Sequence, residues 1–348
     1  MARKLASVQR VLSINPIDGA DLIEVATILG WRCVIKKSEN IKVGDLVVYC
    51  EIDSVFPEKE EYEFLRNCNF RIRTRKFKSQ ISQGICFPLS ILPSGNYNEG
   101  DDITQLLNIQ KYESVIPECL EGIMKGDFPS FIRKTDETRV QVLQDILTKY
   151  KGTKCYYTCK IDGESGSFFY NNKLDLDDQF GVCSRTLWLM DEISEAGDDN
   201  FVPKNTFLKI AQMYDLKYRM KFLNRNLCIQ GEVIGEGIKK NKYKISGHDL
   251  RVFNIFDIDN YKYLDYEEFI KLNRELGLHV CPIIDDNFTL IDDIDALVEL
   301  SKGKSILNPK IEREGIVIRP LAEIDDPKIG RVSFKSINSK FLLNFSDE

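Results

Sequence analysis

The stretch YYTCKIDGESGSFFY at residues 156–170 is typical of two β-strands joined by a glycine-containing turn. Apolar and aromatic residues fill both flanks, and the tetrapeptide KIDG separates them. Lys160 stands at the end of the first strand, where a buried strand normally carries an apolar side chain. A lysine on such a rigid frame can act as a nucleophile if its surroundings deprotonate part of it. Alone, the pattern is weak, because a lysine before a turn is usually just solvated.

Further chemically active residues follow downstream, each next to a β-rich run. Each one alone has a structural explanation, such as a solvent-facing glutamate, a core phenylalanine, a hairpin turn or an edge-strand lysine. Their joint appearance in one order indicates a single site. They are Glu232 in CIQGEVIGEG (228–237), Phe256 with Asp257 in RVFNIFDID (251–259), Glu314 in EREGIVIRP (312–320) and Lys335 in RVSFKSINSKFLL (331–343).

The composition indicates a globular protein of one or two domains. Of the 348 residues, 43% are hydrophobic and 29% are charged, which leaves enough apolar side chains for real cores. No run of 18 uncharged apolar residues occurs, and the opening MARKLASVQRVLS lacks the apolar core of a signal peptide. We therefore expect a cytoplasmic, monomeric protein with no membrane partner.

Cysteine and histidine usage disfavours several classes of site. The ten cysteines are scattered singly without a CxxC pair, and the chain contains only two histidines. Neither a zinc site nor a disulfide framework fits this pattern, so we expect buried thiols. A hydrolase of the Cys/His or Ser/His/Asp type is also poorly supplied.

Residues 1–110 predict a small β-barrel, which the family resemblance given below identifies with an OB-fold domain. Short strands are expected at 31–37, 46–52, 70–77 and 83–89, separated by Gly-, Asp- and Asn-containing turns. One of them, FRIRTRKFKSQ at 70–80, alternates basic and apolar residues although the whole chain has a formal charge of −6. Such a strand can follow a phosphate backbone, and the alternative is an edge strand protected by charge. The candidate RNA-binding residues are Arg71, Arg73, Arg75, Lys76 and Lys78.

Residues 111–348 predict one α+β domain, which begins with a helical connection over 111–150. TDETRVQVLQDILTKY places Val140, Leu143, Ile146 and Leu147 on one face of a helix capped by Thr135 or Asp136. Two further helices are expected near 266–276 and 292–302, each followed by a glycine. Arg139 or Gln141 could approach a ligand, and an interdomain helix is the alternative for that segment.

Taken together, these motifs resemble the covalent nucleotidyltransferase superfamily of ATP-dependent RNA and DNA ligases and RNA capping enzymes. KIDG looks like motif I, FGVCSRTLWL like motif Ia, QGEVIGEG like motif III, FNIFDI like motif IIIa, EGIVIR like motif IV and VSFKSIN like motif V. Segments outside the motifs, such as VGDLVVYCEIDSVFP and FPSFIRKTDETRVQ, are similar to the Naegleria- and Deinococcus-type RNA ligases with an N-terminal OB domain. The resemblance thus covers nearly the whole chain, and it implies a nucleotidyltransferase domain built on antiparallel sheets.

The resemblance implies an ATP-dependent RNA ligase for RNA repair, which seals 3′-OH and 5′-phosphate ends through lysyl-AMP and RNA-adenylate intermediates, with nicked duplex RNA as the expected substrate. Lys160 would be the nucleophile, Phe256 would stack on adenine, and Lys335 would contact the α-phosphate and help to lower the pKa of Lys160. Nucleotide contacts would also involve Gly163, Arg185, Glu232 and Glu314. Asp162, Glu232 and Glu314 would hold Mg²⁺ or Mn²⁺ largely through waters.

Two positions depart from family patterns. Ser165 stands where DNA ligases and capping enzymes usually carry arginine, which disfavours both classes. Ser333 stands where RNA ligases of the T4 type carry the first motif V lysine, so one phosphate contact is missing. The alternatives to an RNA ligase are a DNA ligase, a capping guanylyltransferase, or a non-catalytic OB-fold RNA-binding protein.

Overall fold

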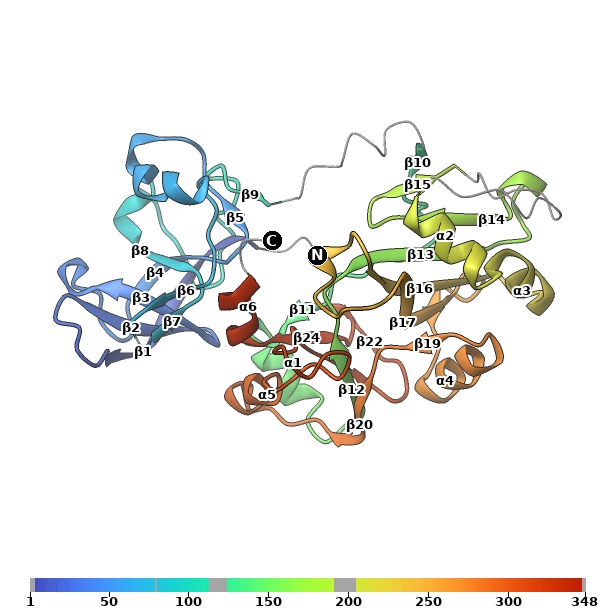
Figure 1. The fold of residues 1–348 in the computed structure, drawn as a ribbon. Helices are drawn as coiled ribbons and strands as arrows, with labels where there is room; N and C mark the ends of the chain where they lie inside the picture. The colour runs from blue at the N-terminus through green and yellow to red at the C-terminus, as the bar shows by residue number, and fades with distance from the viewer. Residues whose placement is uncertain (1–3, 79, 113–123, 191–204, 346–348) are drawn as a thin grey trace.

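The computed structural model describes residues 4–78, 80–112, 124–190 and 205–345. Figure 1 shows an N-terminal OB-fold domain, in blue, beside an α+β domain of antiparallel sheets. Each part has hydrophobic clusters of its own. The expected fold class is therefore confirmed. No helix in the described ranges is both long and apolar enough to span a membrane.

The OB-fold domain is built on a five-stranded sheet in the order β3-β2-β1-β4-β8. The long first strand pairs with β4 through its first half and with β2 through its second half, and its register shifts between Val11 and Ser13. Such a shift bends a strand, so one strand can serve both halves of a barrel. The strands are β1 (Ala6–Pro16), β2 (Ile23–Ile28), β3 (Trp31–Lys36), β4 (Leu46–Cys50), β5 (Ser54–Val55), β6 (Arg75–Phe77), β7 (Gln80–Ser82), β8 (Ile85–Pro88) and β9 (Gln110–Lys111), with 3₁₀ turns η1 (Lys37–Glu39), η2 (Glu60–Cys68) and η3 (Leu89–Ile91).

Three of the four expected barrel strands form as β3, β4 and β8, but the basic strand over 70–77 does not. Only Arg75–Phe77 is a strand, β6, which pairs with β7. Phe70 has a left-handed φ of 55° and is buried, which breaks any extended run at its start. Ile72 and Thr74 are buried as well, so the alternation in the sequence comes from an irregular segment, which is joined to β5 by an isolated antiparallel bridge between Arg71 and Val55.

The second domain contains two sheets. One has eight strands in the order β10-β15-β14-β13-β16-β17-β18, with β19 also on β17, and the other has five in the order β11-β24-β21-β12-β20. The larger sheet comprises β10 (Met124–Asp127), β13 (Glu164–Tyr170), β14 (Phe180–Cys183), β15 (Leu187–Leu189), β16 (Leu227–Gly235), β17 (His248–Asp257), β18 (Lys262–Tyr263) and β19 (His279–Val280). The smaller comprises β11 (Thr138–Arg139), β12 (Lys154–Lys160), β20 (Ile283–Thr289), β21 (Gly315–Pro320) and β24 (Phe334–Ile337), and β22 (Asp325–Asp326) pairs with β23 (Gly330–Arg331).

Helices cover the outer face of each sheet. α2 (Thr206–Met213), α3 (Leu216–Leu223) and α4 (Tyr266–Glu275) pack on the larger sheet in one apolar cluster. α1 (Gln144–Lys149) and α5 (Ile294–Leu300) pack on the smaller sheet in another. α4 and α5 were expected from the sequence, whereas α2 and α3 were not. The faces of the two sheets that are free of helices carry the polar motif residues.

The helix expected from Thr135 or Asp136 onward is wrong in its first half. Thr138–Arg139 forms β11, which pairs in parallel with Phe334–Lys335 of β24, and a 3₁₀ turn, η5 (Val140–Val142), follows. The α-helix begins only at Gln144 and has no side-chain cap. The four apolar residues named for its face are buried as expected. Pairing with a distant strand therefore overrides the local helical pattern.

The barrel touches the second domain next to β11. The Gly30 amide donates to the Gln141 carbonyl at 2.8 Å, and the Arg139 guanidinium lies 5.6 Å from the Trp31 ring centroid. A Cβ at Gly30 would come within 2.8 Å of the Gln141 backbone, so this close approach requires glycine.

Candidate active site

Lys160 is the last residue of β12 and lies on a frame of three paired strands. β12 is hydrogen-bonded to β20 on one side and to β21 on the other, and Lys160 pairs with Gly315. Five consecutive residues of β12, Cys155 to Cys159, are buried, so the strand is anchored up to its last residue. The lysine amine is therefore held in a defined direction.

Glu314 is the direct partner of Lys160. It precedes β21, and the Lys160–Gly315 pairing brings it to 2.8 Å from the amine. Burial lowers the pKa of Lys160, but the carboxylates of Glu314 and Glu232 outweigh burial and hold this pKa above its ordinary value. The expectation that Lys335 lowers the pKa of Lys160 below its ordinary value does not hold in this structure. The reason is that carboxylates, not cations, are the nearest charges.

Glu232 lies on β16 and closes the turn after Lys160. Its Oε1 accepts a hydrogen bond of 2.9 Å from the Gly163 amide. A Cβ at Gly163 would lie 2.3 Å from the Val233 carbonyl oxygen, so the turn can approach β16 only with glycine at this position. Burial raises the pKa of Glu232 to about 8, against the opposing effect of Lys160. The neighbouring Glu314 carboxylate adds to this rise in the pKa of Glu232.

Asp162 lies beside Lys160 in sequence but pairs elsewhere. Its carboxylate binds the Lys242 amine, and its backbone amide donates to the Tyr243 hydroxyl at 2.9 Å. Both partners lie in the β16–β17 connection and were missed from the sequence. The basic run KKNKYK at 239–244 was the available signal.

Lys335 and Arg185 meet at one acidic residue, Asp136. The Lys335 amine lies 3.2 Å from the carboxylate, and Arg185, which is exposed, lies 3.9 Å from it. Lys111 at the end of the barrel also pairs with Asp136, at 3.2 Å. Burial lowers the pKa of Lys335 to about 8; Asp136 opposes this shift, and Arg139 and Lys160 add to it. A buried cation near Lys160 is thus ready for an anion.

Ser333, at the missing lysine position, belongs to a buried polar group next to this cation. Its hydroxyl donates to Glu137 at 3.4 Å, and the same carboxylate oxygen lies 2.8 Å from Arg319. Arg319 is only 1% exposed. A permanent cation is therefore present near the position where a lysine is absent, although it already has a carboxylate partner.

Phe256 is not placed to stack on a nucleotide. It is fully buried among residues such as Phe169, Cys228 and Tyr263. It lies opposite Cys228, four residues from Glu232 and thus roughly 13 Å away along β16. Phe253 is the better candidate, because the β16–β17 bulge leaves it unpaired and half-buried beside the cluster of Ile161, Ile234, Tyr243 and Cys281.

The basic segment of the barrel divides into two groups. Arg71 pairs with Asp53 at 2.7 Å and lies over the Tyr112 ring, so its charge is already used within the barrel. Arg73 is half-buried and its Nε is enclosed. The three exposed cations are Arg75, Lys76 and Lys78. These three are the better candidates for RNA contacts.

The carboxylates fit a hard cation held mainly through water. No three His, Cys, Asp or Glu side chains within the described ranges converge closely enough to hold a metal directly. Asp162, Glu232 and Glu314 nevertheless all lie close enough to Lys160 to raise its pKa, and Glu314 contacts the amine directly. Burial, with smaller contributions from Glu314 and Asp162, raises the pKa of Glu232, and a divalent cation such as Mg²⁺ or Mn²⁺ would stabilise the charged form of this carboxyl group.

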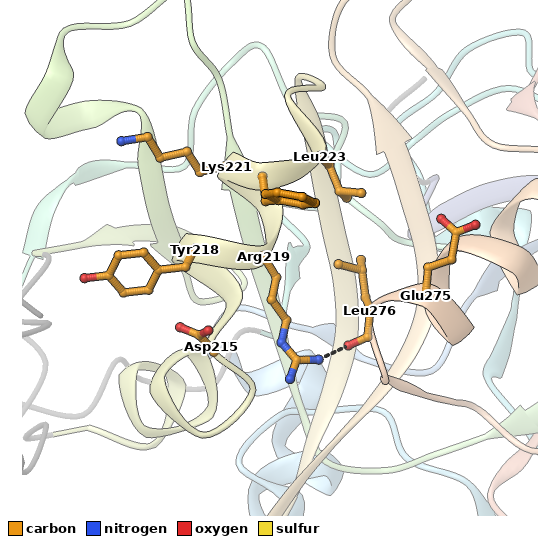
Figure 2. Close-up of a pocket in the computed structure, with 8 residues that line it drawn as sticks. Asp215, Tyr218, Arg219, Lys221, Leu223, Glu275 and Leu276 are labelled. Carbon is orange, nitrogen blue, oxygen red and sulfur yellow. Dashed lines mark hydrogen bonds between the residues drawn. The ribbon is translucent and has the colours of Figure 1, made fainter.

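A separate groove lies between α3 and α4, on the helix-covered side of the larger sheet (Figure 2). Tyr218, Arg219 and Leu276 are among its lining residues, and Arg219 donates to the Leu276 carbonyl at 2.7 Å. None of the motif residues lines it. The reactive groups instead gather between the two sheets.

A strand-borne lysine ringed by carboxylates, joined to an OB-fold domain, defines a nucleotidyltransferase-type ligase. A family model described as RNA ligase matches residues 153–337, and an OB-fold domain model matches residues 5–89. The chain belongs to the RNA ligase family. No curated protein matches the chain.

Solved structures of Naegleria gruberi RNA ligase are similar over the full length. The structure with PPi has 35% sequence identity and a TM-score of 0.85, and it covers 100% of both chains. A variant with ATP and Mn has 35% identity and a TM-score of 0.85, with coverage of 99% of this chain and 100% of that one. A variant with AMP and Mn gives a TM-score of 0.86 at the same identity and coverage.

Proposed function

We propose that this chain is an ATP-dependent RNA ligase that joins RNA 3′-OH and 5′-phosphate ends through a lysyl-AMP intermediate on Lys160. The observation that carries the proposal is the position of the Lys160 amine, fixed at the end of β12 and 2.8 Å from Glu314. Membership in the RNA ligase family supports RNA as the substrate. The Naegleria structures with ATP and Mn support the choice of nucleotide and metal.

In the first step, the Lys160 nitrogen attacks the α-phosphorus of ATP. A nitrogen–phosphorus bond forms, the bond from the α-phosphorus to the bridging oxygen breaks, and pyrophosphate leaves. Lys160 must first lose a proton, and Glu314 is the nearest acceptor at 2.8 Å. Lys335 neutralises charge that develops on the phosphate, which is the main task in phosphoryl transfer.

The later steps reuse the same residues. An oxygen of the RNA 5′-phosphate attacks the phosphorus of AMP, the bond to Lys160 breaks, and RNA-adenylate forms. The oxygen of the RNA 3′-OH then attacks the RNA 5′-phosphorus and releases its proton. The bond from that phosphorus to the bridging oxygen breaks, and AMP leaves with this oxygen. Bound Mg²⁺ or Mn²⁺, held by Asp162, Glu232 and Glu314 through water, would add neutralising charge on the phosphates.

We further propose that the substrate is nicked duplex RNA and that the role is RNA repair in the cytoplasm. The exposed cations Arg75, Lys76 and Lys78 lie on the barrel, apart from the nucleotide site, and suit contacts to phosphates of a bound RNA.

The test begins with purified protein, Mg²⁺ or Mn²⁺, and labelled ATP or GTP without RNA. We expect the ATP label to remain covalently bound in the wild type and to be absent in Lys160→Ala and Lys160→Arg, since arginine stays protonated and cannot attack. Label from GTP would indicate a capping enzyme, and no label would indicate a non-catalytic RNA-binding protein. An adduct mapped to another lysine would overturn the assignment.

A second assay presents nicks with RNA or DNA on each side of the break, together with single-stranded ends. We expect sealing of RNA nicks to be fastest. Faster sealing of all-DNA nicks would contradict the RNA assignment, and faster joining of single strands would contradict the duplex assignment.

A further inference from the structure

We propose that Lys242 is a positioning residue for the reaction: it holds the Asp162 carboxylate in place, and the aromatic rings of the C-terminal helix α6 (Ser339–Phe345) keep it there. The inference rests on the proposed function, because Asp162 matters only if Lys160, two residues earlier, is the nucleophile. Its physical basis is a chain of contacts from α6 to the turn that follows Lys160.

The first contact is the ion pair between Lys242 and Asp162. The Lys242 side chain is only 4% exposed, and its amine bonds directly to the Asp162 carboxylate. A buried ammonium group is costly unless it is paired, so the two groups hold each other in one arrangement. Asp162 is thereby directed to Lys242, and Glu314 remains the direct partner of Lys160.

The second contact is made by α6. The Lys242 amine lies 5.0 Å from the ring centroid of Phe341 and 4.6 Å from that of Phe345. The two rings are themselves 4.7 Å apart, so they form one aromatic wall. Cation–π attraction at these distances stabilises the charged amine and excludes water from it. The last helix of the chain therefore contributes to the active site through a single lysine.

The loop that carries Lys242 is fixed independently. The backbone carbonyl of Lys242 accepts a hydrogen bond of 2.8 Å from the Asn308 side chain. The hydroxyl of the next residue, Tyr243, accepts a hydrogen bond from the Asp162 amide. Lys240, Asn241 and Lys244 have left-handed φ values of 54°, 43° and 56°. Such a conformation is unfavourable for residues other than glycine and persists only where the surroundings impose it. The loop thus presents Lys242 to Asp162 from a constrained backbone.

Two consequences follow for a divalent cation. Lys242 competes with it for Asp162, so cation binding at this carboxylate is weaker than it would be without the lysine. Lys242 also keeps Asp162 and the turn in place while ATP binds. Loss of the lysine should therefore tighten cation binding and at the same time slow lysine adenylylation.

The experiment compares wild type, Lys242→Met and Lys242→Arg in the full-length protein. Mn²⁺ is titrated without nucleotide, with free Mn²⁺ followed by electron paramagnetic resonance. We expect Lys242→Met to bind Mn²⁺ about tenfold more tightly, and adding Asp162→Asn to remove this gain. Lys242→Arg should titrate as the wild type does. A Lys242→Met titration that coincides with wild type overturns the proposal.

Single-turnover adenylylation supplies the second measurement. At saturating ATP and Mn²⁺ we expect Lys242→Met to react about tenfold more slowly with an unchanged ATP KM, and Lys242→Arg to recover most of the rate. Circular dichroism corrects each rate for the folded fraction. A rate for Lys242→Met that equals wild type after this correction, or an equal loss in Lys242→Arg, refutes the positioning role.

The role of α6 is tested with a Phe341→Leu, Phe345→Leu double variant. Its matched control is Phe222→Leu, which alters a phenylalanine of α3 that is 90% exposed and lines the groove away from the motif residues. The double variant should adenylylate Lys160 more slowly than wild type, by a smaller factor than Lys242→Met, and the control should react at the wild-type rate. Equal rates in the double variant and the control would contradict the aromatic contribution. If wild type itself forms no adenylate, the proposed function fails, and the Mn²⁺ titration still decides whether Lys242 controls Asp162.

Discussion

Replacing Lys335 by methionine should stabilise the nucleotide-free protein while it destroys the reaction. The amine is buried near Arg139 and Lys160, and its pKa falls from 10.5 to about 8. This difference corresponds to about 3 kcal/mol of unfavourable free energy for the protonated amine in the folded state. The side chain is 19% exposed and contacts Asp136, and both facts reduce the gain. We expect Lys335→Met to unfold with a free energy about 1 to 3 kcal/mol higher at pH 7.

The pH dependence identifies the cause. Between about pH 8 and 10.5 the unfolded wild-type chain keeps the Lys335 proton and the folded protein does not. The unfolded state then binds more protons, so wild-type stability rises with pH across this window. Methionine does not titrate, and the advantage of Lys335→Met should therefore shrink as pH rises and vanish near pH 10.5.

The assay is urea denaturation of both proteins at pH 7, 8, 9 and 10, alongside lysine adenylylation with labelled ATP. We expect adenylylation by Lys335→Met to fall at least about a hundredfold, because charge on the phosphate loses its buried cation. Lower stability of Lys335→Met at pH 7, or an advantage that does not change with pH, would refute the reasoning.

Four further predictions concern other parts of the site. Glu314→Gln should slow adenylylation by orders of magnitude with an unchanged circular dichroism spectrum, and an unchanged rate would place the proton acceptor elsewhere. Phe253→Ala should raise the ATP KM about tenfold by removing about 1 to 3 kcal/mol of stacking, while an unaltered KM would exclude a stacking role. Arg319 and other cations hold the pKa of Glu137 at about 2 despite burial. The charged Glu137 therefore contributes about 3 kcal/mol to the free energy of unfolding above pH 4.5, and this contribution is lost as the pH falls toward 2. Glu137→Gln should be less stable than wild type at pH 7, and its stability in urea titrations should not show this loss at acid pH. Alanine at the three exposed barrel cations, Arg75, Lys76 and Lys78, should leave adenylylation unchanged and weaken sealing. It should also reduce the slope of log binding constant against log salt concentration for RNA by roughly 0.7 to 0.9 per lost contact. Loss of adenylylation would instead show that the barrel supports the nucleotide site.

Local sequence patterns predicted most of the strands and helices, because each of these elements carries its own periodicity and turn residues. The alternating barrel strands and the capped helices α4 and α5 have periodicity and turn residues of their own. The segment around Arg139 was predicted as helix because its partner, β24, lies almost 200 residues away and is invisible to a local pattern. The prediction of a strand over 70–77 was wrong for a related reason, since the first part of this segment joins β5 through an isolated bridge and a few backbone hydrogen bonds and forms no continuous strand.

Some residues of the candidate site could likewise be predicted from local motifs, and others could not. Lys160 and Glu314 were found because each sits in a short motif whose residues meet through adjacent strands. The motif resemblance pointed to Phe256, and Phe253 was not singled out, because the strand bulge that decides which way each ring faces cannot be read from the local sequence. Lys242 was missed because a lysine in a basic loop looks solvated until the C-terminal helix covers it.

The strand order of the smaller sheet also bears on how the protein is made. The OB-fold sheet uses only residues 6–88, so its partners are all synthesised early. β12, which ends in Lys160, pairs with strands at residues 283–289 and 315–320, and β24 with Lys335 follows at 334–337. Because domains form as their chains emerge, a nascent chain presents a finished barrel long before the nucleophile has its frame. A chain that stops short of β24 therefore has the complete OB-fold sheet but lacks Lys335 and the outer part of the sheet that frames Lys160.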